Sequence, residues 1–250
     1  MPARFEELDW RPTPMGELVL RRRFDPTFQR EVYEIKLDEE YLMSSLFTVA
    51  EEEVARRSLA MLEEGASGEP AETAEPGGGA AATPRWDVLV GGLGLGFTAL
   101  AVLRDARVAS LAVVDTLAEV IDWHRRGLIP AGPALTGDGR CTLVHEDFFA
   151  LVREGGPGRY HAVVVDIDHS PRHLLHPSHA DLYTAAGAQR LAAMLRPGGV
   201  FGLWSNDPPD EDYLATLRPA FADVRAEVVS FPNPLQGREA TATLYLARRG

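Results

Sequence analysis

The sequence predicts an α/β fold in which a mostly parallel, seven-stranded sheet follows a small N-terminal appendage. Three observations predict it. Strand and helix patterns alternate from Arg85 to the end of the chain, which is the rhythm of β-α-β units. A glycine-rich turn at 91–96 joins the first of these strands to the first helix. The last two strands flank the short connection F-P-N-P-L-Q-G, which leaves no room for a helix, so we expect them to pair antiparallel.

The N-terminal appendage is predicted over residues 1–64. Apolar and polar residues alternate in part over 16–24 and more clearly over 30–43, which is typical of half-buried strands. We expect the two strands to form a β-hairpin through Asp25-Pro26.

A helix is predicted next, over 46–64, with Thr48 as its N-cap and Glu51 three residues further on, in the pattern of a capping box. Residues 65–84 are rich in Gly, Ala, Pro and Glu and lack large apolar side chains. Because such a segment cannot offset the entropy of ordering, we expect a flexible linker there. Residues 85–250 are then predicted to form one nucleotide-binding domain.

The elements of this domain follow from short apolar runs and helical periodicity. Strands are predicted at 87–91, 110–115, 140–145, 161–166, 199–204, 224–231 and 240–247. Helices are predicted at 95–105, 116–125, 147–153, 180–195 and 210–220.

The glycine turn carries the first chemical prediction. Gly91, Gly92, Gly94 and Gly96 allow a sharp turn and the close approach of a ligand to the backbone. The helix that follows offers free N–H groups and a positive dipole end. Asp115 ends the next strand, where it is placed to accept hydrogen bonds from ribose hydroxyls. The segment therefore predicts a binding site for an adenosine-type nucleotide.

The composition limits which partners and which cellular compartment we expect for this protein. The net charge of −12 argues against a nucleic-acid partner and favours a cationic substrate electrostatically. No apolar run approaches the ~20 residues that a membrane span needs, so we expect no membrane partner. The single cysteine, Cys141, and the absence of an apolar signal-peptide core at the N-terminus predict a cytoplasmic protein.

Five segments in this order resemble the class I S-adenosylmethionine-dependent methyltransferases, and within them the spermidine synthase-like (polyamine aminopropyltransferase) group. They are the glycine turn, V-V-D-T ending at 116, H-E-D-F-F at 145–149, Y-H-A-V-V-V-D-I-D-H-S-P at 160–171, and the run from Leu182 to L-A-A-M-L-R-P-G-G-V at 191–200. The resemblance implies a Rossmann-like sheet and a homodimer. It implies S-adenosylmethionine or its decarboxylated form as co-substrate, with no metal, and it assigns Asp147 to the adenine amino group.

The resemblance leaves the transferred group open. Aminopropyl transfer uses a decarboxylated donor whose amine needs an acid, and the group supplies one inside the glycine turn, where this chain has Gly94. The group's strand-end Asp-x-x-Asp is matched by Asp166, but His169 stands at the second position and Asp168 lies one residue short. The resemblance implies Asp166 as the base, with Asp168 and His169 as further catalytic candidates. The three acids at 51–53 lie near the group's Tyr-Gln pair without a secure alignment.

Several functions therefore compete. The first is a divergent polyamine synthase that transfers an aminopropyl group to a small, cationic acceptor. The second is a methyltransferase on an unknown small-molecule acceptor, because backbone N–H groups at Gly94 accept a donor carboxylate that an acid would repel. The third is a non-catalytic homologue that keeps only the nucleotide pocket. A nicotinamide oxidoreductase is disfavoured, because Asp147 and the terminal β-pair fit methyltransferases better.

Four histidines lie close together in D-H-S-P-R-H-L-L-H-P-S-H, at positions 169, 173, 176 and 179. Pro171 and Pro177 break the helix that would bring the rings to one face, so we expect a polar loop over the pocket rather than a metal site. His169 is the candidate for acceptor contact or proton transfer. The segment 204–207, W-S-N-D, either lines the acceptor site or forms a strand-end turn.

Overall fold

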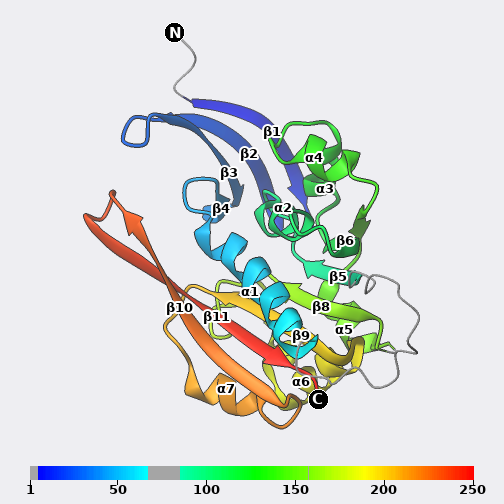
Figure 1. The fold of residues 1–250 in the computed structure, drawn as a ribbon. Coiled ribbons are helices and arrows are strands. Elements are labelled where there is room, and N and C mark those ends of the chain that lie inside the picture. The colour runs from blue at the N-terminus through cyan, green and yellow to red at the C-terminus, as the bar shows by residue number, and fades with distance from the viewer. Residues whose placement is uncertain (1–4, 67–84, 157) are drawn as a thin grey trace, which may run out of the picture.

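The computed structural model describes residues 5–66, 85–156 and 158–250, which form two β-sheets with helices packed on the larger one (Figure 1). The linker predicted at 65–84 lies outside the described residues from position 67 onward.

A four-stranded antiparallel sheet opens the chain, in the order β1-β2-β3-β4. Its strands are β1 Phe5–Thr13, β2 Gly16–Asp25, β3 Arg30–Leu37 and β4 Glu40–Ser44. The predicted hairpin is confirmed as β2 and β3, which pair antiparallel. The run predicted as one strand at 30–43 is two, because Asp38 turns the chain with a φ of 51°. The Asp38 carboxylate stabilises this turn by accepting a hydrogen bond from the Glu17 N–H at 2.7 Å.

The larger sheet has seven strands in the order β10-β11-β9-β8-β5-β6-β7. They are β5 Trp86–Gly91, β6 Val108–Asp115, β7 Cys141–His145, β8 Tyr160–Val165, β9 Leu195–Ser205, β10 Asp223–Asn233 and β11 Arg238–Arg248. Strands β5 to β9 run parallel to one another, whereas β11 pairs antiparallel with both β9 and β10. The predicted α/β class and the antiparallel terminal pair are confirmed.

Helices connect these strands and cover both faces of the sheet. They are α1 Val49–Ala66, α2 Phe97–Leu103, α3 Ala118–Arg125, α4 Gly132–Gly137, α5 Phe148–Glu154, α6 Ala185–Met194 and α7 Glu211–Leu217. The helix predicted at 180–195 is divided, because a 3₁₀ helix at Pro177–Tyr183 precedes α6. None of the described helices has the length and apolar character that crossing a membrane requires.

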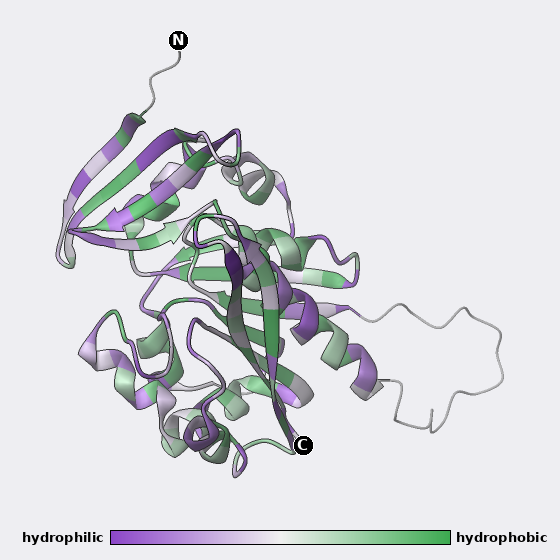
Figure 2. Cartoon of the chain, turned by 90° about the vertical axis from the view of Figure 1, so that its left-hand side faces the viewer, coloured by the Kyte–Doolittle hydropathy of each residue, from purple (hydrophilic) through white to green (hydrophobic). Residues whose placement is uncertain are grey.

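Alternate residues of the central strands face two hydrophobic clusters, one on each side of the sheet. In β5, Val88 and Val90 belong to one cluster and Leu89 to the other. Leu20 of the N-terminal sheet and Val54 of α1 are buried in the same cluster as Val88. The predicted appendage thus shares its core with the predicted nucleotide-binding domain. The green strands of the large sheet show this apolar interior, whereas purple segments are frequent on the N-terminal sheet (Figure 2).

Candidate active site

The register of the parallel strands places two acids beside the glycine turn. Gly91, at the end of β5, pairs with Val114 of β6 on one side and with Val165 of β8 on the other. Asp115 and Asp166 each follow these partners by one residue. The chain moves outward from β5 to β7 and then returns to β8, so this edge is also where the strand order reverses. Ligands of open α/β sheets bind at such a point.

The glycine turn itself is set by two close approaches. At Gly92, with a φ of +94°, an added Cβ would lie 2.1 Å from the backbone oxygen of Asp166. At Gly94, with a φ of +45°, an added Cβ would lie 2.6 Å from the Met43 sulfur. The thioether of β4 therefore occupies the space into which a side chain at position 94 would project. His124 steadies the turn, because its Nε2 lies 2.9 Å from the Gly94 carbonyl oxygen.

A cavity of about 610 Å³ opens over this edge of the sheet. Both sheets contribute to it. Apolar and aromatic side chains from the N-terminal sheet and the loop before α1 form one wall, among them Tyr41, Met43 and Phe47. The predicted strand-end segment contributes Trp204 and Asn206 to the lining. Four acids and no Lys or Arg stand among its described lining residues: Glu51, Asp115, Asp147 and Asp166.

Asp115 lines the cavity and also binds the backbone of the glycine turn. Its carboxylate accepts hydrogen bonds from the backbone N–H groups of Leu93 at 2.9 Å and Leu117 at 2.8 Å. Burial raises its pKa, and these two hydrogen bonds oppose the shift. The acid therefore fixes the glycine turn to the end of β6 while its side chain remains at the cavity surface.

Asp147 lines the cavity at the start of α5. One carboxylate oxygen accepts from the Phe149 N–H at 2.8 Å, which makes Asp147 the N-cap of that helix. The other oxygen lies 3.2 Å from Nη2 of Arg153. Capping therefore holds an exposed carboxylate at the cavity.

Asp166 ends β8 at the bottom of the cavity. The Thr98 hydroxyl donates to its Oδ2 at 2.5 Å. Desolvation raises the pKa of Asp166 to about 6, against the lowering effect of that hydrogen bond. Asp166 thus changes protonation state near neutral pH, which suits a group that accepts a proton from a substrate.

Glu51 is a cavity residue that the sequence analysis did not assign to the site. The structure places its side chain in the cavity, whereas the Thr48 hydroxyl lies 3.1 Å from Glu52, so Glu51 is not part of a capping box. The missed signal is helical periodicity, because Glu51 precedes the buried Val54 and Ala55 by three and four residues on one face of α1.

Asp168 lies behind the cavity wall rather than in it. Its fully buried carboxylate accepts three hydrogen bonds at 2.8 Å, from the Leu175 N–H, His179 Nδ1 and the Tyr183 hydroxyl. The His179 ring in turn stacks on Phe149, with centroids 3.6 Å apart. Asp168 therefore positions the segment that covers the cavity, and its oxygens are already occupied by protein donors.

Replacing Asp168 by Ala is expected to lower the free energy of unfolding by about 2–4 kcal/mol, because three buried donors lose their acceptor. Urea denaturation would measure the loss, and limited proteolysis would show cleavage between 169 and 183. Asp223→Ala is the control, since that residue is exposed at the start of β10. A loss below about 1 kcal/mol would mean that the segment is held by other contacts.

The four clustered histidines separate in the structure. His169, His176 and His179 line the cavity, whereas His173 lies outside it and contacts Asp207 at 3.1 Å. Within the part of the chain that the structure describes, no three His, Cys, Asp or Glu side chains are arranged to hold a metal ion.

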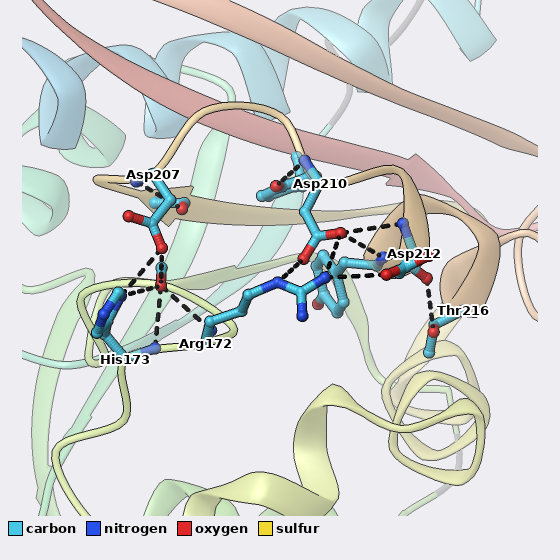
Figure 3. Close-up of polar contacts among 10 residues, drawn as sticks. Arg172, His173, Asp207, Asp210, Asp212 and Thr216 are labelled. Carbon is cyan, nitrogen blue, oxygen red and sulfur yellow. Dashed lines mark hydrogen bonds and ion pairs between the residues drawn. The ribbon is translucent and has the colours of Figure 1, made fainter.

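Polar contacts bind the segment that covers the cavity to the start of α7 (Figure 3). The residues that make them are Ser170, Arg172, His173, Asp207 and Asp210. Arg172 binds the Asp210 carboxylate through two hydrogen bonds of 2.6 and 2.9 Å. The Ser170 hydroxyl donates to Asp207 at 2.5 Å. These contacts hold the loop after β8 against the loop after β9. They therefore fix the position of the segment that covers the cavity.

The comparisons with known proteins agree with this geometry. No family model matches the chain. Polyamine aminopropyltransferase 2 of Pseudomonas aeruginosa is 34% identical over 158 residues, which cover 58% of this chain and 43% of that protein. Putrescine N-methyltransferase 1 of Nicotiana tabacum is 32% identical over 122 residues, which cover 49% of this chain and 31% of the relative. The chain thus spans less than half the length of the curated relatives it matches.

Solved structures match nearly the whole chain. Spermidine synthase from Thermotoga maritima superposes with a TM-score of 0.70 at 16% identity, covering 98% of this chain and 73% of that structure. The chain has the fold of spermidine synthase. A probable spermidine synthase from Corynebacterium glutamicum superposes with a TM-score of 0.62 at 14% identity, covering 99% and 81%. The spermidine synthase-like fold accounts for the N-terminal sheet as well as the methyltransferase sheet, because both lie within the superposed length.

Proposed function

We propose that this protein transfers an aminopropyl group from decarboxylated S-adenosylmethionine to a small, cationic amine. The observation that carries the proposal is the cavity at the glycine turn, which is lined by four acids and by no Lys or Arg among the described residues. Such a cavity attracts a sulfonium donor and an ammonium acceptor, and it disfavours anionic substrates.

The proposed roles follow from position. The donor's adenosine lies along the glycine turn, with Asp115 toward the ribose and Asp147 toward the adenine amino group. Asp166 lies at the transfer end of the cavity. The acceptor is related in chemistry to the substrates in the relatives' names, polyamine and putrescine.

The proposed reaction releases one proton, which a group in the site must accept. The acceptor binds as an ammonium ion and must lose a proton before its nitrogen can attack. The nitrogen lone pair then forms a bond to the aminopropyl carbon next to sulfur. The carbon–sulfur bond breaks and its electron pair returns to sulfur, which becomes the neutral thioether of 5′-methylthioadenosine. The chain supplies a nearby carboxylate to accept the proton and an acidic wall to hold both cations.

Methyl transfer from S-adenosylmethionine is the second candidate, and one observation favours it. The thioether of Met43 fills the space at Gly94 where an acid would hold the donor's amine. The similarity to putrescine N-methyltransferase is consistent with the same acceptor class.

Product analysis distinguishes the two reactions. The purified protein would be incubated with putrescine and either donor, and the nucleoside product identified by chromatography. Aminopropyl transfer is expected to release 5′-methylthioadenosine only with the decarboxylated donor. Release of S-adenosylhomocysteine from S-adenosylmethionine would instead establish methyl transfer. Binding of neither donor in calorimetric titration would contradict both assignments of the glycine turn.

A further inference from the structure

We propose that Glu51 and Asp166 form a carboxylate pair that holds the acceptor's reacting ammonium group. The proposal deepens the proposed function and rests on it for the identity of the reaction. Its own claim, an amine subsite made by these two acids, is testable without turnover.

The first argument is placement. Glu51 stands in the first turn of α1, on the face that continues as the buried Val54 and Ala55. Its side chain therefore points toward the sheet, where it lines the same cavity as Asp166. The two neighbouring acids are used elsewhere: Glu52 pairs with Arg104 at 2.6 Å, and Glu53 pairs with Arg56 and Arg57.

The second argument is the lack of a counter-ion. Within 5–66, 85–156 and 158–250, no Lys, Arg or His forms an ion pair with Glu51 or Asp166. The groups that act electrostatically on Glu51 are Asp166, at the end of β8, and its neighbour Glu52. The other titratable side chains that line the cavity are Tyr41, Asp115, Asp147, His169, His176 and His179. Two acids without a cation in one cavity are a site to which an ammonium ion adds the missing charge.

Protonation supports this assignment. Burial, and next the charge of Asp166, raise the pKa of Glu51, and burial also raises the pKa of Asp166. In the empty cavity the pair therefore keeps a proton at pH values at which free carboxyl groups have lost theirs. An ammonium ion between the two acids favours the ionised form of both, so its binding expels a proton. The ionised pair is then placed to accept the proton that the amine must lose.

The decisive measurement is a calorimetric titration with putrescine at pH 7, with and without 5′-methylthioadenosine, in two buffers of different ionisation enthalpy. The wild type is expected to release close to one proton per amine bound. Glu51→Gln is expected to release almost none and to bind putrescine about 10- to 100-fold more weakly, while binding 5′-methylthioadenosine as the wild type does. Glu53→Gln, two residues along the same helix, is the matched control and should behave as the wild type, since its carboxylate pairs with Arg56 and Arg57.

A ligand-free readout accompanies it. An acid whose pKa is higher in the folded state stabilises less as pH rises, because the folded protein then binds more protons than the unfolded chain. The melting temperature of the wild type should therefore fall between pH 6 and pH 8 by more than that of Glu51→Gln. Glu53→Gln should follow the wild type.

The outcomes separate the two proposals. Equal proton release and equal putrescine affinity in the wild type and Glu51→Gln would overturn the role of Glu51, even if the enzyme transfers aminopropyl groups. Failure of the wild type to bind putrescine in either titration would overturn the amine subsite. Failure to bind 5′-methylthioadenosine would overturn the proposed function, while the titration of the free protein would still decide on Glu51.

Discussion

Asp166→Asn is expected to lower kcat/KM by about 10²- to 10⁴-fold, the range that removal of a general base produces. The substitution keeps the shape of the side chain and an oxygen that accepts the Thr98 hydroxyl, which now donates at 2.5 Å. It removes the negative charge from the end of β8, next to the glycine turn. Steady-state kinetics with putrescine and the decarboxylated donor would measure the effect.

Binding and stability serve as controls for this variant. Affinity for 5′-methylthioadenosine should stay within about threefold of the wild type, since the nucleoside is assigned to Asp115 and Asp147 instead. Asp223→Asn, on the exposed start of β10, should leave the kinetics unchanged. Full activity of Asp166→Asn would remove this acid from the mechanism. Loss of nucleoside binding together with activity would assign it to donor binding.

Gly92→Ala is expected to have the largest effect on stability, a loss of about 3–5 kcal/mol from a strained φ and a steric clash together. The residue has a φ of +94°, and the new Cβ would lie 2.1 Å from the backbone oxygen of Asp166. That oxygen belongs to the end of β8, a strand paired with β5 and β9, so relief requires movement of the sheet itself. Nucleoside binding should fail with the turn.

Thermal denaturation would measure the change, expected to be a fall in Tm of roughly 10 °C for a chain of this size. Gly137→Ala is the matched control. Nothing lies within 4 Å of its new Cβ, and its φ is not positive. The control should melt within about 2 °C of the wild type. A similarly small change for Gly92→Ala would mean that the turn is compliant.

Local patterns were sufficient to predict most of the fold. Valine-rich runs such as 163–165 predict buried parallel strands, because only a strand covered on both faces is apolar along its whole length. The glycine turn and Asp115 predict the nucleotide-binding end of the sheet. This prediction needs only residues that lie close together along the chain. Strand β1 escaped prediction because its residues are largely exposed and show little alternation.

The amine end of the cavity was decided by tertiary structure. Glu51 belongs to α1, whereas Asp166 directly follows β8, more than a hundred residues further on, and only the packing of α1 against the sheet brings them together. Asp168 shows the converse, because the family resemblance implies a catalytic candidate there, whereas Leu175, His179 and Tyr183 bind its oxygens away from the cavity lining. The sequence by itself determined the sheet, the glycine turn and the acids at the strand ends, since each depends on neighbours in the chain. Burial and charge contacts between distant segments decided which acids line the cavity and in which direction their pKa values shift.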